Sequence, residues 1–244
     1  MRKEKKLFPC EIALLVAVMI NSINLCLLVK SSFGISTLSS VSFVLSSVLS
    51  GLSFGTWTFL IQIITMIILV FIIKKFKTSY IFSFVVASFF SMFVDIVTLL
   101  MNGLPIGFWW RIFYFLIGFI GLGFGAALFI KSRLPAMPFD LFVRDVSEEK
   151  HWSIRSVKIV YDLVSVGISI AVSYLFLHKI VGVGIGTIVS AFTMGIVVQF
   201  FVRILEKNYS FEPYFKVTKT IMEKGNLKDK INRYFNNIFH RNKS

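Results

Sequence analysis

The stretch TWTFLIQIITMIILVFII, residues 56–73, decides the fold of this chain. It contains no charged residue, and Gln62 is its single amide side chain. An α-helix needs about 20 apolar residues to cross the roughly 30 Å of bilayer hydrocarbon, so this stretch predicts a transmembrane helix. Comparable runs occupy approximately residues 9–29, 80–101, 108–130, 159–177 and 183–202. The sequence therefore predicts an all-α membrane protein with six transmembrane helices.

The composition excludes several other classes of protein. Hydrophobic residues make up 56% of the 244 residues and charged residues 16%, well below the roughly 25% charge that is typical of soluble domains. The two cysteines, Cys10 and Cys26, lie in one apolar run, and about 24 Å of helix separates them. They therefore cannot form an intrachain disulfide, and we interpret them as small core residues. The three histidines are isolated, so we expect no metal site and no cofactor.

The positive charges predict the orientation of the chain. With six spans, 23 of the 26 Lys and Arg residues fall on one face, and the others are Lys30, Arg111 and Lys179. Positive residues in short flanking segments stay cytoplasmic. We therefore expect a multi-pass protein of the bacterial inner membrane with both termini in the cytoplasm, and we interpret the first run as an uncleaved span. The net charge of +14 is then mostly a topology signal, and nucleic-acid binding is not expected.

A weak internal repeat divides the chain into two halves. GISTLSSVSFVLS at residues 34–46 resembles PAMPFDLFVRDVS at residues 135–147, and Ser53 corresponds to Ser153 at an offset of about 100 residues. Each half contains three spans, so the second half must enter the membrane inverted relative to the first. Inverted repeats are frequent in transporters, where the halves meet around a central site, but duplication can also serve assembly alone.

Each half also contains a segment that is too polar to cross the membrane and too apolar to be a loop. Residues 31–53 are rich in serine, and residues 135–147 contain Asp140, Arg144 and Asp145. We expect re-entrant or half-inserted helices, although an interfacial amphipathic helix has the same pattern. The predicted organisation is a basic N-terminus, two membrane repeats and a cytoplasmic tail, over residues 1–8, 9–104, 105–204 and 205–244.

Polar residues inside the spans are the candidates for a binding site, because ionisable groups in hydrocarbon usually face the bundle interior or water. Asp95 and Arg111 fall near the same face and could form a structural ion pair or bind a charged substrate group. Asn21, Asn24, Gln62 and Asp162 could line a cavity at mid-depth, while single amides can equally serve helix packing. The candidate substrate-binding residues are Asn21, Asn24, Ser36, Ser39, Gln62, Asp95, Arg111, Asp140 and Asp162.

Other patterns indicate packing and surface binding. Gly121 and Gly125 are four residues apart and predict a close helix seam. The chain has none of the H-E-x-x-H, G-x-S-x-G or nucleotide-binding glycine motifs, so we do not expect an enzyme. In the tail, apolar residues from Leu227 to Phe239 recur at helical spacing opposite basic residues. Such a helix could bind the anionic inner leaflet or a cytoplasmic protein partner.

Several of these motifs together resemble the YczE/YitT-type (YczE/YyaS/YitT) family of bacterial integral membrane proteins. They are Gly34 with its serine-rich continuation, LSFGTW at 52–57, Asp95, Arg111, MPFD at 137–140 and VGIGT at 183–187. The resemblance covers roughly residues 10–204. The first half has Thr37 and Ser39 where this family usually has Pro and Asp. The resemblance implies the membrane topology and no particular substrate.

Two functions are consistent with the sequence. The first is a small-molecule or ion permease, or a membrane substrate-binding subunit, with one central site where the two repeats meet. The second is a non-transporting membrane scaffold or regulatory protein whose basic tail recruits a cytoplasmic partner. A polar cavity at mid-depth would favour the first function, whereas a core packed with Phe and Leu would favour the second.

Overall fold

The computed structural model describes residues 6–134 and 137–215. In this part of the chain, six helices are long and apolar enough to cross a membrane. They are α1 (Cys10–Ser31), α3 (Phe54–Ile73), α4 (Thr78–Leu100), α5 (Phe108–Ser132), α7 (Ile154–Leu177) and α8 (Ile185–Asn208). The six predicted spans are thereby confirmed. The largest differences are at the beginning of α7 and the end of α8, where polar turns continue the helix beyond its apolar part.

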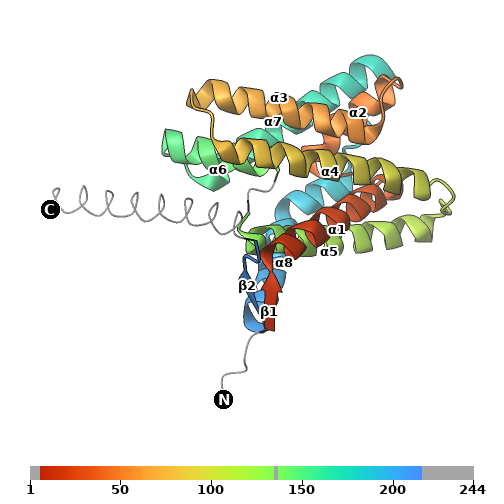
Figure 1. Cartoon of the computed structure of the whole chain (residues 1–244). Helices are drawn as coiled ribbons and strands as arrows, with labels where there is room; N and C mark the ends of the chain where they lie inside the picture. The colour runs from red at the N-terminus through yellow and green to blue at the C-terminus, as the bar shows by residue number, and fades with distance from the viewer. Residues whose placement is uncertain (1–5, 135–136, 216–244) are drawn as a thin grey trace.

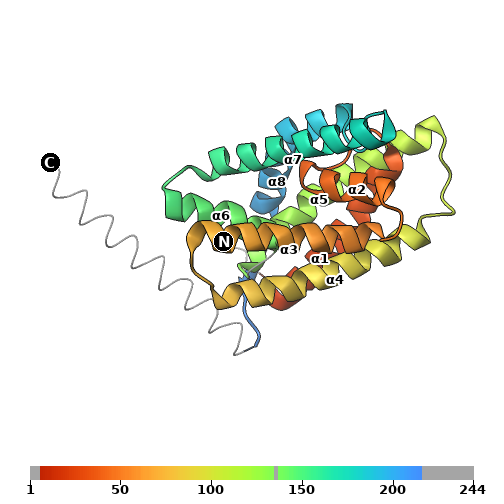
Figure 2. The same cartoon turned by 90° about the horizontal axis from the view of Figure 1, so that it is seen from above.

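Two shorter helices lie in the segments that were predicted to be half-inserted. They are α2 (Thr37–Val48) and α6 (Pro138–Lys150), and each precedes the second long helix of its half. In both views α6 lies toward the end of the molecule where α3 connects to α4, and α2 lies toward the opposite end, where α4 connects to α5 (Figures 1 and 2). The short helices thus occupy opposite halves of the bundle's length.

The helices form two groups that α4 joins. In the first group α1 packs along α5, and α5 also packs against α8. In the second group α2 packs against α7, α6 packs against α3, and α2 and α3 contact each other. Helix α4 contacts both α1 and α3 and lies between the two groups in Figure 1. The second group contains both short helices, so the unpaired backbone N–H and C=O groups at the ends of these helices lie within this group.

Equivalent turns recur in the two halves. The hydroxyl of Ser31 donates to Leu28 O and accepts from Phe33 N–H at the end of α1, while Ser132 makes the same pair of bonds with Phe129 and Leu134 at the end of α5. Likewise Ser53 and Ser153 each accept a backbone N–H three residues later and cap α3 and α7. The local geometry therefore follows the offset seen in the sequence.

A small sheet closes the chain at one end of the bundle. Strand β1 (Lys6–Pro9) pairs in parallel with β2 (Tyr209–Glu212), with Phe8 opposite Phe211. The sequence analysis did not predict these strands. The pairing places the segment before the first span beside the segment after the sixth (Figure 1), as an even number of spans requires. The predicted amphipathic tail helix at 227–239 lies outside the described residues.

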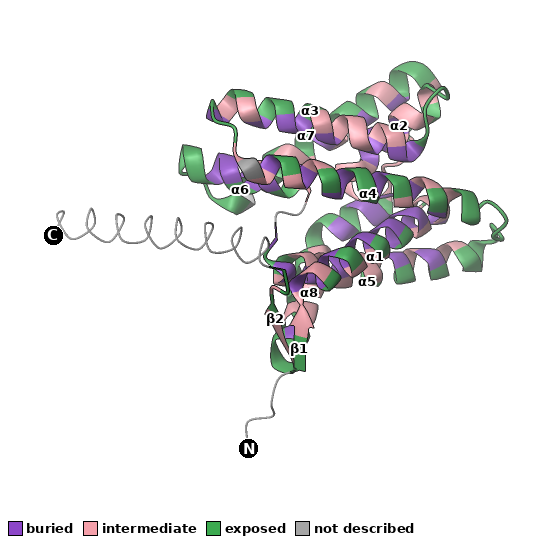
Figure 3. Cartoon of the chain, viewed as in Figure 1, coloured by how far each residue is buried: buried purple, intermediate pink, exposed green. Residues whose placement is uncertain are grey.

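Exposed apolar side chains cover the outside of the bundle. Green ribbon, which marks exposed residues, extends along the long helices in Figure 3. Phe71 on α3, Leu163 on α7 and Phe192 on α8 are 67–80% exposed. A soluble protein would bury such side chains, whereas lipid solvates them without cost. The buried core is correspondingly rich in small and polar residues, notably serines such as Ser22, Ser83 and Ser169.

Candidate functional site

A cluster of polar side chains lies inside the second helix group, where α2 begins beside α7. The carboxylate of Asp162 accepts a 2.8 Å hydrogen bond from the Thr37 hydroxyl at the first turn of α2. Its other oxygen forms a 3.0 Å ion pair with Lys158, one turn earlier on α7. Asp162 is eight residues beyond Ile154, or about 12 Å along α7. The N-terminus of α2 therefore meets α7 well inside the span.

The N-terminus of α6 reaches the same level of α7. The ring of Phe139, the second residue of α6, contacts that of Tyr161 edge to face at 4.8 Å, and the Lys158 ammonium lies 5.3 Å from the centre of the Phe139 ring. Tyr161 in turn shares a 3.0 Å hydrogen bond with Thr65 of α3. The first turns of two short helices thus contact adjacent residues of one transmembrane helix, and α3 closes the other side.

Gln62 lies on the buried stripe of α3 that leads to this cluster. It precedes Thr65 by three residues, so both side chains are on one face of the helix. Gln62 is only 8% exposed, and its Oε1 atom is buried with no hydrogen-bond partner. Buried polar atoms nearly always have a partner, and leaving one without costs about 1–3 kcal/mol. An unsatisfied acceptor here is a place where a bound solute could donate a hydrogen bond.

The arrangement is suited to a small polar or charged solute. The N-terminal ends of helices carry partial positive charge and free N–H groups, and two such ends lie beside Lys158 and Asp162. The side chains of Lys158 and Asp162 are 49% and 21% exposed, so their ion pair is partly open and can exchange partners. Among the described residues no three His, Cys, Asp or Glu side chains are grouped to hold a metal ion.

The predicted residues of α2 and α6 lie near this cluster. Ser36 is the residue before α2, and its carbonyl accepts from Ser39 N–H, so the two flank Thr37. Asp140 lies in the first turn of α6, where its carboxylate accepts from Met137 N–H at 3.4 Å. Together with Gln62 and Asp162, these residues are those of the predicted set that the fold brings to the second helix group.

The two asparagines lie elsewhere, and the predicted cavity with Gln62 and Asp162 is not formed by the described residues. The Asn21 amide packs against Gly125 of α5, and the Asn24 amide packs against Gly121. A Cβ atom at either glycine would lie 2.2–2.5 Å from the amide. The predicted close packing of helices at Gly121 and Gly125 is therefore confirmed, and the two glycines leave room for two asparagine amides between α1 and α5. Each amide donates a hydrogen bond to a backbone carbonyl of α1.

Asp95 and Arg111 do not form the predicted ion pair in the part of the chain that the structure describes. The Asp95 carboxylate instead accepts from the Ser53 hydroxyl at 2.6 Å and from Gly55 N–H at 2.7 Å. A carboxylate at a helix N-terminus satisfies free N–H groups there and complements the helix dipole. Gly55 is required because a Cβ there would lie 2.2 Å from the backbone oxygen of Ser91 and 2.6 Å from the carboxylate. The Nε of Arg111 is buried with no partner.

Residues that the sequence analysis did not select hold the short helices in place. Asp145 of α6 is buried and bonds Lys77 and Tyr80 at 2.8 Å each and Arg144 at 2.9 Å. Burial alone would raise the pKa of Asp145, but the charge of Arg144 and these hydrogen bonds hold it below its usual value. Thr37, Lys158 and Tyr161 were also not selected. The i, i+4 spacing from Asp162 was a signal available in the sequence for Lys158.

The turn before α2 is attached to the beginning of α8. Phe33 O accepts from Gly186 N–H at 2.8 Å, and Ile35 O accepts from the Thr187 hydroxyl at 2.9 Å. Gly34 has φ +121°, and a Cβ there would lie 2.4 Å from Thr187 Oγ1, so only glycine fits. The VGIGT motif thus positions the extended segment that leads into α2.

The fold and the comparisons with known proteins together define the class of this chain. It is a polytopic membrane protein, with six apolar helices and a polar cluster inside one helix group. Residues 10–203 match the family of unknown function DUF6198, and the chain belongs to that family. Nothing in these comparisons confirms the YczE/YitT-type name that the motifs suggested.

A relative in Haemophilus influenzae, described as an uncharacterized protein, is 31% identical over 119 residues. This match covers 48% of the chain and 50% of the relative, so the chain spans about half the length of that protein. No solved structure matches the chain.

Proposed function

We propose that this protein is a small-molecule or ion permease, or a membrane substrate-binding subunit, of the bacterial inner membrane. Its site is the polar cluster of α2, α3, α6 and α7. The observation that carries the proposal is that two short helices begin beside adjacent residues of α7, through Thr37 on Asp162 and Phe139 on Tyr161. Short or discontinuous helices with their termini at mid-membrane are typical of the substrate sites of secondary transporters.

The unsatisfied Gln62 acceptor supports a polar substrate. The Oε1 atom of Gln62 has no partner, and the residue is 92% buried. A solute that donates a hydrogen bond to this atom would therefore remove the free-energy cost of a buried, unpaired acceptor. The solute would be held by Gln62 and by Asp162, which can exchange Thr37 or Lys158 for a bound group. The protein has no nucleotide-binding motif, so uphill transport would require an ion gradient or a separate ATPase.

We infer that the two halves are inverted repeats and that α2 and α6 are half-inserted from opposite faces. The repeated serine turns at Ser31 and Ser132 support a duplication. The corresponding contacts of α2 with α7 and of α6 with α3 support a two-fold relation between the halves. The distribution of basic residues supports a cytoplasmic location for both termini.

Cysteine accessibility tests the site. In a chain with Cys10 and Cys26 replaced by alanine, Gln62→Cys should react with a membrane-impermeant thiol reagent applied to one face of sealed vesicles. Met66→Cys is the matched control, because Met66 lies one turn along the same helix, is 1% exposed and packs in an apolar cluster. A permease must admit water to its site, so only Gln62→Cys should react.

The alternative function predicts a different result. A non-transporting scaffold has no need of a hydrated interior, so both cysteines should stay unreactive from both faces, and that result would refute the permease. A thermal-shift screen of small polar solutes gives a second test, because a ligand that binds the folded state raises the melting temperature. The shift should disappear in Asp162→Asn.

A further inference from the structure

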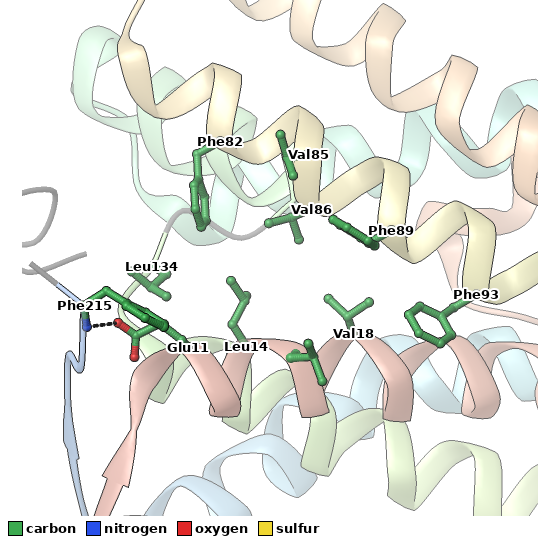
Figure 4. Close-up of a pocket in the computed structure, with 11 residues that line it drawn as sticks. Glu11, Leu14, Val18, Phe82, Val85, Val86, Phe89, Phe93, Leu134 and Phe215 are labelled. Atoms are coloured by element: carbon green, nitrogen blue, oxygen red, sulfur yellow. Dashed lines mark hydrogen bonds between the residues drawn. The ribbon is translucent and has the colours of Figure 1, made fainter. Parts of the chain in front are cut away.

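A separate apolar groove lies between α1 and α4. Its volume is about 420 Å³, and its walls are Leu14, Leu15 and Val18 of α1 and a row of α4 side chains. Figure 4 shows side chains of both helices pointing into the space between them, with Glu11 and Phe215 at one end and Phe93 at the other. None of the residues proposed for the polar site lines this groove, so it does not depend on the proposed function.

The shape of the groove matches a hydrocarbon chain. On α4 it is lined by residues 82–93, a length of about 16 Å of helix, and the hydrocarbon of one bilayer leaflet is about 15 Å deep. Apart from Glu11 at its end, every lining residue is Leu, Val or Phe. The volume lies in the range of ligand sites, about 300–1,000 Å³. An extended acyl chain from one leaflet would fill it lengthwise.

The groove begins at the end of the bundle that carries the sheet. Glu11 is in the first turn of α1, directly after β1, and its carboxylate accepts backbone N–H bonds from Tyr214 and Phe215 at 3.0–3.1 Å. These bonds hold the Phe215 ring at the mouth of the groove (Figure 4). The segment after β2 therefore forms one wall of the opening.

A cation stands beside this opening. Arg133 is the exposed residue that ends α5, and the next residue, Leu134, lines the groove. Arg133 therefore lies at the sheet end of the groove, where the headgroup of a lipid would lie if the acyl chain occupied the groove. A guanidinium binds phosphate in bidentate geometry.

We propose that this groove binds one acyl chain of an anionic phospholipid, with the lipid phosphate at Arg133. The length and the apolar lining suit an acyl chain, and the position of Arg133 sets its orientation, with the headgroup at the sheet end and the chain terminus near Phe93. The lipid is a fixed structural or regulatory ligand of the first helix group.

Native mass spectrometry of the full chain, titrated with phosphatidylglycerol, tests the proposal. Leu15→Trp combined with Val85→Phe should fill the groove and lower the affinity by at least about fivefold, since excluding even a few methylenes loses more than 1 kcal/mol of burial. Leu163→Trp combined with Val164→Phe adds the same bulk to exposed positions of α7 that do not line the groove and should leave the affinity unchanged. Equal effects of the two double variants would show that the lipid binds anywhere on the lipid-facing surface of the protein, and would overturn the proposal.

Two further measurements locate the lipid without filling the groove. Arg133→Gln should weaken phosphatidylglycerol about fivefold and phosphatidylcholine less, because both lipids carry the phosphate but only phosphatidylglycerol is anionic, and one basic residue near the surface contributes about 1 kcal/mol toward anionic lipid. Free glycerol phosphate should not compete, and competition would show a headgroup site without an acyl-chain site. In the wild-type chain, a diazirine near the end of the acyl chain should label the part of the groove near Phe93. Labelling confined to helices other than α1 and α4, or to residues 216–244, would refute the assignment.

Discussion

The partner of Asp95 distinguishes the structure from the simplest interpretation of the sequence. The sequence suggests an Asp95–Arg111 ion pair, whereas the structure places the carboxylate on Ser53 and Gly55 at the beginning of α3. Two double-mutant cycles can identify which residue interacts with Asp95. One combines Asp95→Ala with Ser53→Ala, and the other combines Asp95→Ala with Arg111→Gln.

The expected magnitudes follow from the contacts. A hydrogen bond to a charged group contributes about 1.5–3 kcal/mol when buried, and Ser53 is exposed, so we expect a coupling of about 1–2 kcal/mol between Asp95 and Ser53. No described contact joins Asp95 to Arg111, so their effects should add to within about 0.5 kcal/mol. For a chain of this size 1 kcal/mol corresponds to about 2–4 °C, and the Ser53 coupling should be about 2–8 °C in melting temperature.

The assay is thermal unfolding of the purified variants in one detergent, followed by tryptophan fluorescence. The non-additive part of each cycle is the quantity to compare, because it cancels the separate effects of the single substitutions. A coupling to Arg111 that is as large as the coupling to Ser53 would refute the assignment and restore the ion pair.

Three other substitutions test different parts of the fold. Gly125→Ala should destabilise the protein by about 1–3 kcal/mol in thermal unfolding because its Cβ would overlap the amide between α1 and α5, whereas Gly167→Ala, with open space around it, should not destabilise it; equal effects would contradict the seam. The lowered pKa of Asp145 means that its ionised form stabilises the fold above the unfolded pKa of about 3.9, and that this contribution is lost as the pH falls through the lower folded value. The difference in melting temperature between wild type and Asp145→Asn should therefore be largest near neutral pH and should become smaller as the pH falls below about 3.9. A difference that does not change with pH would argue against an ionised Asp145. Glu11→Gln should speed hydrogen exchange at Phe215, because the charge-assisted bonds that hold this residue become weaker, and unchanged exchange would show that other contacts hold it.

The transmembrane helices were predictable because length and hydropathy in a bilayer leave few alternatives to a helix. The beginning of α7 was placed late because Lys158 and the polar turn before it were excluded from the apolar run, whereas the Ser153 cap begins the helix at Ile154. The sheet was missed because four-residue strands such as Lys6–Pro9 carry little periodicity, and their partner lies about 200 residues away.

The site was only partly predictable. Asp162 and Gln62 were identified from polarity within apolar runs, since that signal is local. Their neighbours depend on how helices are arranged, and a sequence does not show which face of α1 meets α5. For this reason the asparagines were grouped with Gln62 although Asn21 packs on Gly125. Thr37 was recognised only as a departure from a family pattern, although its hydroxyl binds Asp162.

The parallel pairing of β1 with β2 imposes an order on biogenesis. Lys6–Pro9 is synthesised and reaches the membrane surface before the first helix, but its partner, Tyr209–Glu212, emerges from the ribosome only after the sixth. The two strands can therefore pair only after all six transmembrane helices have been synthesised and delivered to the translocon. Glu11 also accepts the backbone N–H of Tyr214, so a segment that is synthesised after the sixth helix completes the mouth of the groove beside the first helix.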